Sequence, residues 1–149
     1  MNRAVIEVNL RGSMTARNNK KTAGTILVAE DHVGVRALAG RVLRSRGYEV
    51  LEAADGAEAL DLLHRYPRPI HLLLTDWCMP RMSGSELCRQ LRDRRPETRI
   101  LVMSGYLGDQ PQPAAAFLQK PFSAPDLLRM VEQVLRPLKP GITIASRNS

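Results

Sequence analysis

The chain has 149 residues, with 22 lysines and arginines against 15 aspartates and glutamates, and a formal net charge of +7. A hydrophobic content of 44% and a charged content of 25% are typical of a soluble globular protein of one domain, and they exclude a disordered or fibrous chain. No apolar run approaches the roughly 20 residues that span a bilayer, and the N-terminus has no continuous apolar signal core, so we expect a cytoplasmic protein without a membrane partner.

Residues 1–24 come first in the chain, and we predict that they form a flexible basic tail, because they are polar and lack periodicity. A second tail is predicted at residues 137–149, where Pro137, Pro140 and Gly141 stop any helix. Most of the excess positive charge lies in these two tails, and the body between them is close to neutral, with no basic patch interleaved with aromatics. We therefore expect no direct binding of nucleic acid.

Between the tails, apolar strands alternate with amphipathic helices. Apolar, β-rich segments predict five strands, at residues 25–29, 48–53, 70–75, 99–103 and 115–118. Apolar residues at helical spacing predict helices between them, the first ended by Gly47 and the others at 57–66, 83–95 and 124–136. The alternation indicates an α/β domain over residues 25–136, with a doubly wound parallel sheet and a functional crevice at the carboxyl ends of its strands.

Polar side chains follow four of the predicted strands. Glu30 and Asp31 come after the first strand, Asp76 after the third, Ser104 after the fourth and Lys120 after the fifth. Three carboxylates packed together repel one another unless a cation lies among them, and Mg²⁺ suits hard oxygen ligands and a phosphate partner. A carboxylate in such a site can attack a phosphoryl group, while Lys120 and Ser104 neutralise and hydrogen-bond the phosphoryl oxygens.

Four segments of the chain resemble the receiver domain of two-component response regulators, of which the chemotaxis regulator is the simplest example. They are Ile26-Leu27-Val28-Ala29-Glu30-Asp31, Leu72-Leu73-Leu74-Thr75-Asp76 with Met79-Pro80 and Ser83-Gly84, Met103-Ser104-Gly105-Tyr106, and Phe117-Leu118-Gln119-Lys120-Pro121-Phe122. The resemblance covers residues 25–136 and implies a flavodoxin-like receiver fold with the strand order 2-1-3-4-5.

The resemblance also implies a role for each site residue. Asp76 would accept a phosphoryl group from a phosphohistidine of a sensor or hybrid histidine kinase. The implied ligands of Mg²⁺ are Glu30, Asp31, Asp76 and the backbone carbonyl of Cys78. Ser104 and Lys120 would contact the phosphoryl group, Tyr106 would move inward as the aromatic reporter of the switch, and the Lys120–Pro121 peptide bond would be cis.

The chain departs from the family pattern between Ser104 and Lys120. Only residues 105–119 separate them, and the fifth strand takes about five of these positions. Glycines and prolines interrupt the remainder, and proline inside a helix costs about 3 kcal/mol. We therefore predict that the fourth helix of the usual receiver is reduced or absent, and with it part of the face that carries dimerisation and output in the family.

Simpler interpretations exist for the same residues. Glu30 and Asp31 are typical caps of a following helix, Ser104 can belong to a turn, Lys120 to the solvated surface and Tyr106 to the packing. Cys78 is not expected to be a reactive nucleophile beside carboxylates, and Cys88 is expected to pack in the core. The arginine-rich segment 89–99 indicates a solvated face that stabilises a helix C-terminus, or else a contact with an acidic partner.

The sequence supports more than one function. We predict a phosphoacceptor receiver that acts as a conformational switch or phosphate shuttle, and whose only chemistry is its own phosphorylation and dephosphorylation. The alternative is a non-phosphorylated pseudo-receiver that binds a partner protein. A phosphatase of the haloacid dehalogenase type is disfavoured, because it needs a second aspartate where this chain has Cys78. We expect no second domain after residue 136, so that output passes through a partner, unless the chain is a fragment of a hybrid kinase.

Overall fold

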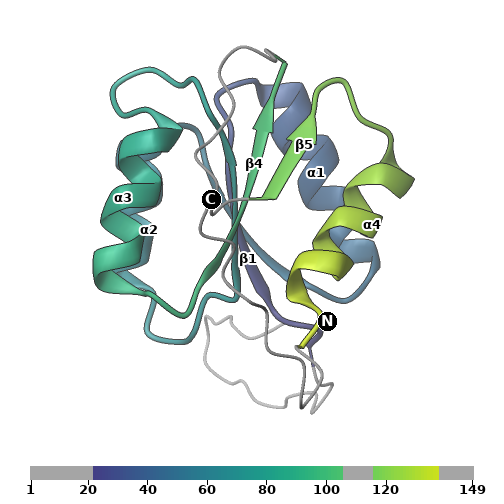
Figure 1. Ribbon diagram of the computed structural model, residues 1–149, viewed down its shortest axis with the longest axis horizontal. Coiled ribbons are helices and arrows are strands. Elements are labelled where there is room, and N and C mark those ends of the chain that lie inside the picture. The colour runs from purple at the N-terminus through teal and green to yellow at the C-terminus, as the bar shows by residue number, and fades with distance from the viewer. Residues whose placement is uncertain (1–21, 106–115, 138–149) are drawn as a thin grey trace, which may run out of the picture.

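A five-stranded parallel sheet forms the centre of the protein (Figure 1). The computed structural model describes residues 22–105 and 116–137, and within them the strands follow the order β2-β1-β3-β4-β5. The strands are β1 (Thr25–Ala29), β2 (Glu49–Ala53), β3 (Leu72–Asp76), β4 (Arg99–Ser104) and β5 (Ala116–Gln119). The helices are α1 (Val33–Ser45), α2 (Gly56–Arg65), α3 (Gly84–Arg94) and α4 (Ala124–Leu135). The predicted doubly wound fold and its strand order are confirmed.

Helices cover both faces of the sheet, α1 and α4 on one side and α2 and α3 on the other (Figure 1). Every residue of β1 and β3 is buried, because these central strands are covered on both faces. On one face Leu43 and Leu127 pack against the sheet, and on the other Leu63 and Leu87 do so. The continuous apolar runs of the two strands follow from this double coverage.

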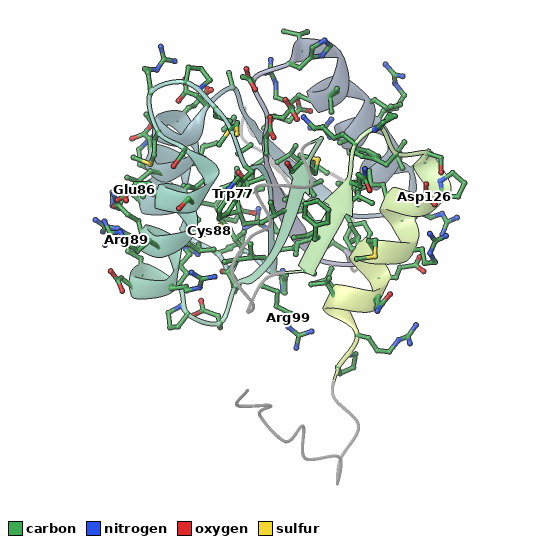
Figure 2. The ribbon with its side chains drawn as sticks, turned by 45° about the horizontal axis from the view of Figure 1, so that its top comes forward. Trp77, Glu86, Cys88, Arg89, Arg99 and Asp126 are labelled. Carbon is green, nitrogen blue, oxygen red and sulfur yellow. The ribbon has the colours of Figure 1, made fainter. Side chains whose placement is uncertain are left out.

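Helix α3 shows how one element divides between core and surface. Cys88 faces the sheet, on the same side as Trp77, whereas Glu86 and Arg89 form an ion pair on the outer side of the helix (Figure 2). Burial raises the pKa of the Cys88 thiol to about 11, so this side chain stays neutral and acts as a small packing residue, as predicted.

Polar side chains determine where each helix begins. The N-cap residues, each accepting a hydrogen bond from a backbone N–H three residues ahead, are His32, Asp55, Ser83 and Ser123. The cap of α1 is thus His32, whose Nδ1 accepts from the N–H of Val35 at 3.2 Å. The simpler interpretation of Glu30 and Asp31 as the N-cap of this helix is wrong, because His32 fills that position.

Three predicted strands, β3, β4 and β5, end one residue later than expected, and for β3 and β4 the added residue belongs to the predicted site. Asp76 is the last residue of β3 and pairs with Met103, while Ser104 is the last residue of β4 and pairs with Gln119. Sheet pairing therefore holds the backbone of both residues directly, instead of leaving them in flexible loops.

Some expectations fall outside the described residues. These include most of the two predicted tails and most of the segment for which a reduced or missing fourth helix is predicted. Within residues 22–105 and 116–137, no helix is both long enough and apolar enough to cross a membrane.

Candidate functional site at the carboxyl ends of the strands

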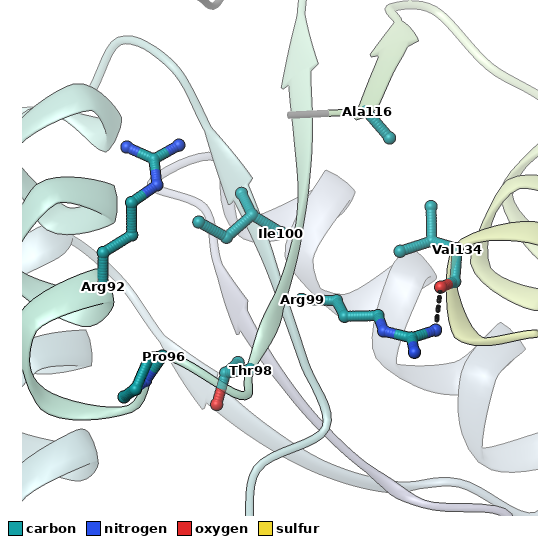
Figure 3. A pocket seen from close by; sticks show the side chains of 7 residues that line it. All are labelled: Arg92, Pro96, Thr98, Arg99, Ile100, Ala116 and Val134. Carbon is teal, nitrogen blue, oxygen red and sulfur yellow. Dashed lines mark hydrogen bonds between the residues drawn. The ribbon is translucent and has the colours of Figure 1, made fainter. Parts of the chain in front are cut away.

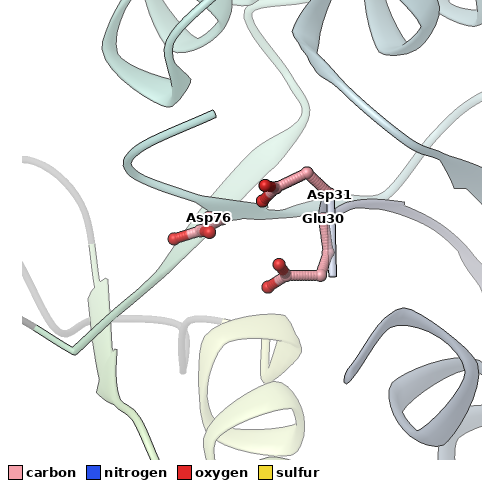
Figure 4. A group of neighbouring side chains, drawn as sticks. All are labelled: Glu30, Asp31 and Asp76. Atoms are coloured by element: carbon pink, nitrogen blue, oxygen red, sulfur yellow. The ribbon is translucent and has the colours of Figure 1, made fainter. Parts of the chain in front are cut away.

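Three carboxylates meet at the carboxyl edge of β1 and β3. Ala29 pairs with Thr75 in the sheet, so the next residues, Glu30 and Asp76, lie side by side. Asp31 adds a third carboxylate from the loop that follows β1 (Figure 4). One carboxylate oxygen from each residue lies within 4.8 Å of the other two, which places three negative charges around one small space.

Lys120 closes this space from the side of β5. Its Nζ lies 2.6 Å from Glu30 Oε1 and 3.2 Å from Asp76 Oδ2. The backbone N–H of Lys120 donates to the carbonyl of Ser104 at 2.8 Å, which extends the pairing of β4 and β5 up to the lysine. The Lys120–Pro121 peptide bond is cis, as expected from the resemblance. The sequence prediction that Lys120 belongs with the carboxylates, and not with the solvated surface, is therefore confirmed in geometry.

Glu30 is held from several directions. Its Oε2 accepts a hydrogen bond from the backbone N–H of His32 at 2.9 Å, and its carbonyl accepts one from the guanidinium of Arg36 at 2.8 Å. Its Oε1 is buried and forms a close ion pair with Lys120 Nζ. The side chain is only 1% exposed, and its position is thus determined by the protein and not by solvent.

Burial and neighbouring charge shift the pKa of two site residues. Burial raises the pKa of the Glu30 carboxyl, the negative charge of Asp76 raises it further, and Lys120 and the N–H of His32 act in the opposite direction. Burial lowers the pKa of the Lys120 ammonium, but its pairing with Glu30 and the charge of Asp76 outweigh this effect and raise the pKa above its usual value. Lys120 therefore stays positively charged at neutral pH.

The other predicted site residues lie around this group or outside the description. Ser104 is buried at the end of β4, one residue beyond the sheet partner of Asp76. Cys78 is exposed and lies in the loop that leads to α3. It follows Asp76 by two residues in the sequence. Tyr106 lies outside the described residues.

The donor set fits a hard divalent cation. Carboxylate oxygens are the ligands that such ions prefer, and Glu30, Asp31 and Asp76 can each turn one oxygen toward a common point. The single positive charge of Lys120 offsets only one of the three carboxylate charges, which is a second reason for a cation to bind there.

Sequence reasoning missed an ion pair beside this site. The buried carboxylate of Asp55 pairs with the guanidinium of Arg81, which lies in the loop between β3 and α3. Asp55 could be recognised in the sequence as a helix cap, but no spacing rule relates it to a residue 26 positions away. Gly84 belongs to one of the receiver-like segments, but only the structure gives its steric role: a Cβ there would collide with the carbonyl oxygen of Asp76.

A separate pocket of about 510 Å³ lies at the opposite edge of the sheet (Figure 3). It is lined by the start of β4 and β5 and by the C-terminal ends of α3 and α4, with Arg92 and Arg99 among its residues. Because it is formed at the amino ends of β4 and β5, this pocket is not part of the carboxylate site.

The fold and the site define a class of protein: a doubly wound parallel α/β domain with an acidic cluster and a lysine at the carboxyl ends of its strands. Residues 26–132 match the response regulator receiver domain family. The chain belongs to this family, which places it in two-component signal transduction.

Two curated proteins illustrate the relationship. The chain is 39% identical over 119 residues to the sensor kinase CckA of Brucella abortus (strain 2308), an alignment that covers 76% of this chain and 13% of that protein. It is 40% identical over 121 residues to the response regulator MprA of Mycobacterium avium (strain 104), covering 77% of this chain and 52% of that protein. The chain thus spans about half of one relative and a small part of the other.

Solved structures agree with the assignment. The crystal structure of the receiver domain from the hybrid histidine kinase CckA matches with a TM-score of 0.69 and 40% identity, covering 76% of this chain and all of that one. A CheY-like receiver domain protein from Methanospirillum hungatei JF-1 matches with a TM-score of 0.67 and 26% identity, over 75% of this chain and 93% of that one.

Proposed function

We propose that the chain is a phosphoacceptor of a two-component system or phosphorelay, with Asp76 as the residue that receives the phosphoryl group. The observation that carries this proposal is the grouping of Glu30, Asp31 and Asp76 within 4.8 Å, with Lys120 Nζ 3.2 Å from Asp76. The donor is a phosphohistidine of a sensor or hybrid histidine kinase, and transfer takes place in the cytoplasm. Family membership and the CckA and MprA relatives support this partner.

In the transfer, an Asp76 carboxylate oxygen attacks the phosphorus atom of the donor. The bond between phosphorus and the histidine nitrogen breaks, and the electron pair stays on the imidazole, which takes up a proton. Lys120 offsets negative charge on the phosphoryl oxygens, and Ser104, at the end of the neighbouring strand, is the predicted hydrogen-bond donor. The phosphoryl group is transferred onto the chain itself, and apart from the phosphohistidine donor we propose no separate substrate.

Mg²⁺ is the proposed cofactor. Its ligands would be carboxylate oxygens of Glu30, Asp31 and Asp76 and the backbone carbonyl of Cys78, and bound Mg²⁺ would offset the charge of the carboxylates and the phosphoryl oxygens. Phosphorylation would then alter the protein as a switch, or pass the phosphoryl group on as a shuttle.

Intact mass spectrometry after incubation with acetyl phosphate tests the proposal. We expect a gain of one phosphoryl group that requires Mg²⁺, is lost with EDTA and is absent in Asp76→Asn. Ser45→Ala is the matched control, because Ser45 is an exposed hydroxyl at the end of α1, far along the chain from the site. Label that persists in Asp76→Asn would assign the phosphoryl group to another residue.

The alternative function is a pseudo-receiver that binds a partner without being phosphorylated. It predicts no mass gain in the wild-type protein under any condition and no heat of Mg²⁺ binding in isothermal titration calorimetry.

A further inference from the structure

The loop between β3 and α3, residues 77–83, is fastened to the protein at two points. We propose that Arg81 is a positioning residue for the metal site: its ion pair with Asp55 holds the tip of this loop against the N-terminus of α2 and thereby fixes the backbone carbonyl of Cys78. The inference deepens the proposed function and rests on it, because that carbonyl is there a ligand of Mg²⁺.

The first point of attachment is the base of the loop, where Trp77 and Gly84 meet beside the phosphoacceptor. The N–H of Gly84 donates to the carbonyl of Trp77 at 2.9 Å, and the N–H of Trp77 donates to Met103 in β4 at 3.0 Å. A side chain at Gly84 would collide with the carbonyl oxygen of Asp76, so the first turn of α3 lies directly against that residue. Both ends of the loop are therefore fixed relative to Asp76.

The second fastening holds the tip. Arg81 pairs with Oδ2 of Asp55, while Oδ1 of Asp55 accepts the N–H of Glu58 at 2.9 Å and caps α2. The Asp55 side chain is 3% exposed and that of Arg81 is 71% exposed, so a surface arginine compensates a buried carboxylate. An ion pair between two solvated groups is weak and would not constrain the loop. The pair of Arg81 with the buried, hydrogen-bonded carboxylate of Asp55 is stronger and does constrain it.

The backbone at the tip has a conformation that needs support. Arg81 has a φ of 67°, in the left-handed region that residues other than glycine rarely adopt. The neighbouring Met82 lies against Gly56, where an added Cβ would come within 2.5 Å of the Met82 carbonyl oxygen. Close packing at Met82 and the ion pair at Arg81 thus hold the tip against the start of α2. In the chain, Cys78 lies between this tip and the base of the loop at Trp77.

Positioning and simple charge predict opposite effects on Mg²⁺ binding. Removing the positive charge of Arg81 would, through charge alone, strengthen the binding of a cation. Releasing the loop that presents the Cys78 carbonyl would weaken it, because residues that orient metal ligands contribute to affinity. The direction of the change in the Mg²⁺ dissociation constant therefore separates the two effects.

The test is isothermal titration of the full chain with Mg²⁺ at constant ionic strength. Arg81→Ala is expected to weaken binding about tenfold, and Arg81→Lys to restore most of the affinity. Asp55→Asn removes the charge but keeps a good N-cap, and should weaken binding to a similar extent. The double variant Asp55→Asn/Arg81→Ala should be no weaker than either single variant, because both lose the same interaction.

Arg65→Ala is the matched control. Arg65 is an exposed arginine at the other end of α2, paired with Asp61, so its removal changes the net charge equally without touching the loop. Its Mg²⁺ affinity should equal or slightly exceed that of the wild-type protein. Thermal unfolding without Mg²⁺ shows whether each variant is folded, and Arg81→Gln, which also removes the positive charge, carries the test if Arg81→Ala is not.

Each outcome has a definite meaning. Wild-type or tighter Mg²⁺ affinity in Arg81→Ala, or equal weakening in Arg65→Ala, would overturn the positioning role while leaving the proposed function intact. Absence of Mg²⁺ binding in the wild-type protein would instead overturn the proposed function, and the inference with it.

Discussion

At the scale of single residues, the site concentrates more negative charge than it compensates. In the part of the chain that the structure describes, Lys120 is the one cation paired with this group, through Glu30 and Asp76, and Glu30 is almost fully buried. Such an arrangement disfavours the folded state when no metal is bound, because the carboxylates repel one another at short range. The proposed affinity for a cation and the expected loss of stability without one have the same origin.

The first prediction at this scale is that Asp76→Asn is more stable than the wild-type protein in EDTA, by roughly 1–2 kcal/mol at pH 7. Added Mg²⁺ should reduce the difference, because binding to the wild-type site stabilises its folded state. Urea unfolding in EDTA and in Mg²⁺ measures both values. Equal or lower stability of the variant in EDTA would contradict the charge argument.

The pH dependence of this gain follows from the raised pKa of Glu30. At a pH between the usual pKa of 4.5 and the raised pKa in the folded protein, folded Glu30 keeps a proton that the unfolded chain has released. The contribution of Glu30 to the free energy of unfolding therefore falls as the pH rises from 4.5 through the raised pKa. The charge of Asp76 contributes to the raised pKa, so the fall is smaller in Asp76→Asn. The advantage of the variant should therefore grow between pH 4.5 and pH 7, and a constant or shrinking advantage would show that the two carboxyls are not coupled.

At the scale of elements, two arginines stabilise the C-terminal ends of helices to which they do not belong. Arg95 follows α3, and Arg99 begins β4. Arg95 donates to the carbonyls of Leu63 and Tyr66 at the end of α2 and to that of Arg68 beyond it. Arg99 donates to the carbonyl of Val134, in α4 (Figure 3). The predicted role at a helix C-terminus is confirmed for this segment, but the helices are α2 and α4, on opposite faces of the sheet.

Arg95→Ala is therefore expected to lower the free energy of unfolding by about 2 kcal/mol, because several carbonyls at the end of α2 lose their donor. Arg94→Ala, an exposed arginine one position earlier, should change it by no more than about 0.5 kcal/mol. Chemical denaturation of both variants gives the comparison. Equal effects would mean that Arg95 acts only through charge.

At the scale of the whole molecule, stability should decrease from the centre of the sheet to its edge at β5. All residues of β1 and β3 are buried, whereas β5 has four residues, pairs only with β4 among the described strands, and has one buried residue, Leu118. Amides of β1 and β3 should exchange hydrogen only through global unfolding, and those of β5 through local opening with a lower free energy. Hydrogen exchange followed by NMR measures both, and equal protection in β3 and β5 would contradict this gradient.

Local sequence patterns predicted most of the architecture. Strand β1, the end of β2 and the starts of β4 and α4 lie where the apolar pattern placed them. The other boundaries differ by one or two residues, since hydrophobic periodicity does not mark the last hydrogen-bonded pair of a strand. The order of polar residues after the strands predicted that Glu30, Asp31, Asp76 and Lys120 would meet. It could do so because parallel strands bring their carboxyl ends to the same edge of a sheet.

What the sequence by itself determined is thus the α/β alternation, the parallel sheet and the residues at its carboxyl edge, all of which follow from local periodicity and strand direction. Only the tertiary structure decided that Glu30 is buried while Asp31 is exposed, that Arg81 reaches Asp55, and that Arg95 caps α2. The two arginine contacts join positions 26 to 32 residues apart through long side chains. Their partners depend on how α2, α3 and the loop before α3 pack together, and no local pattern carries that information.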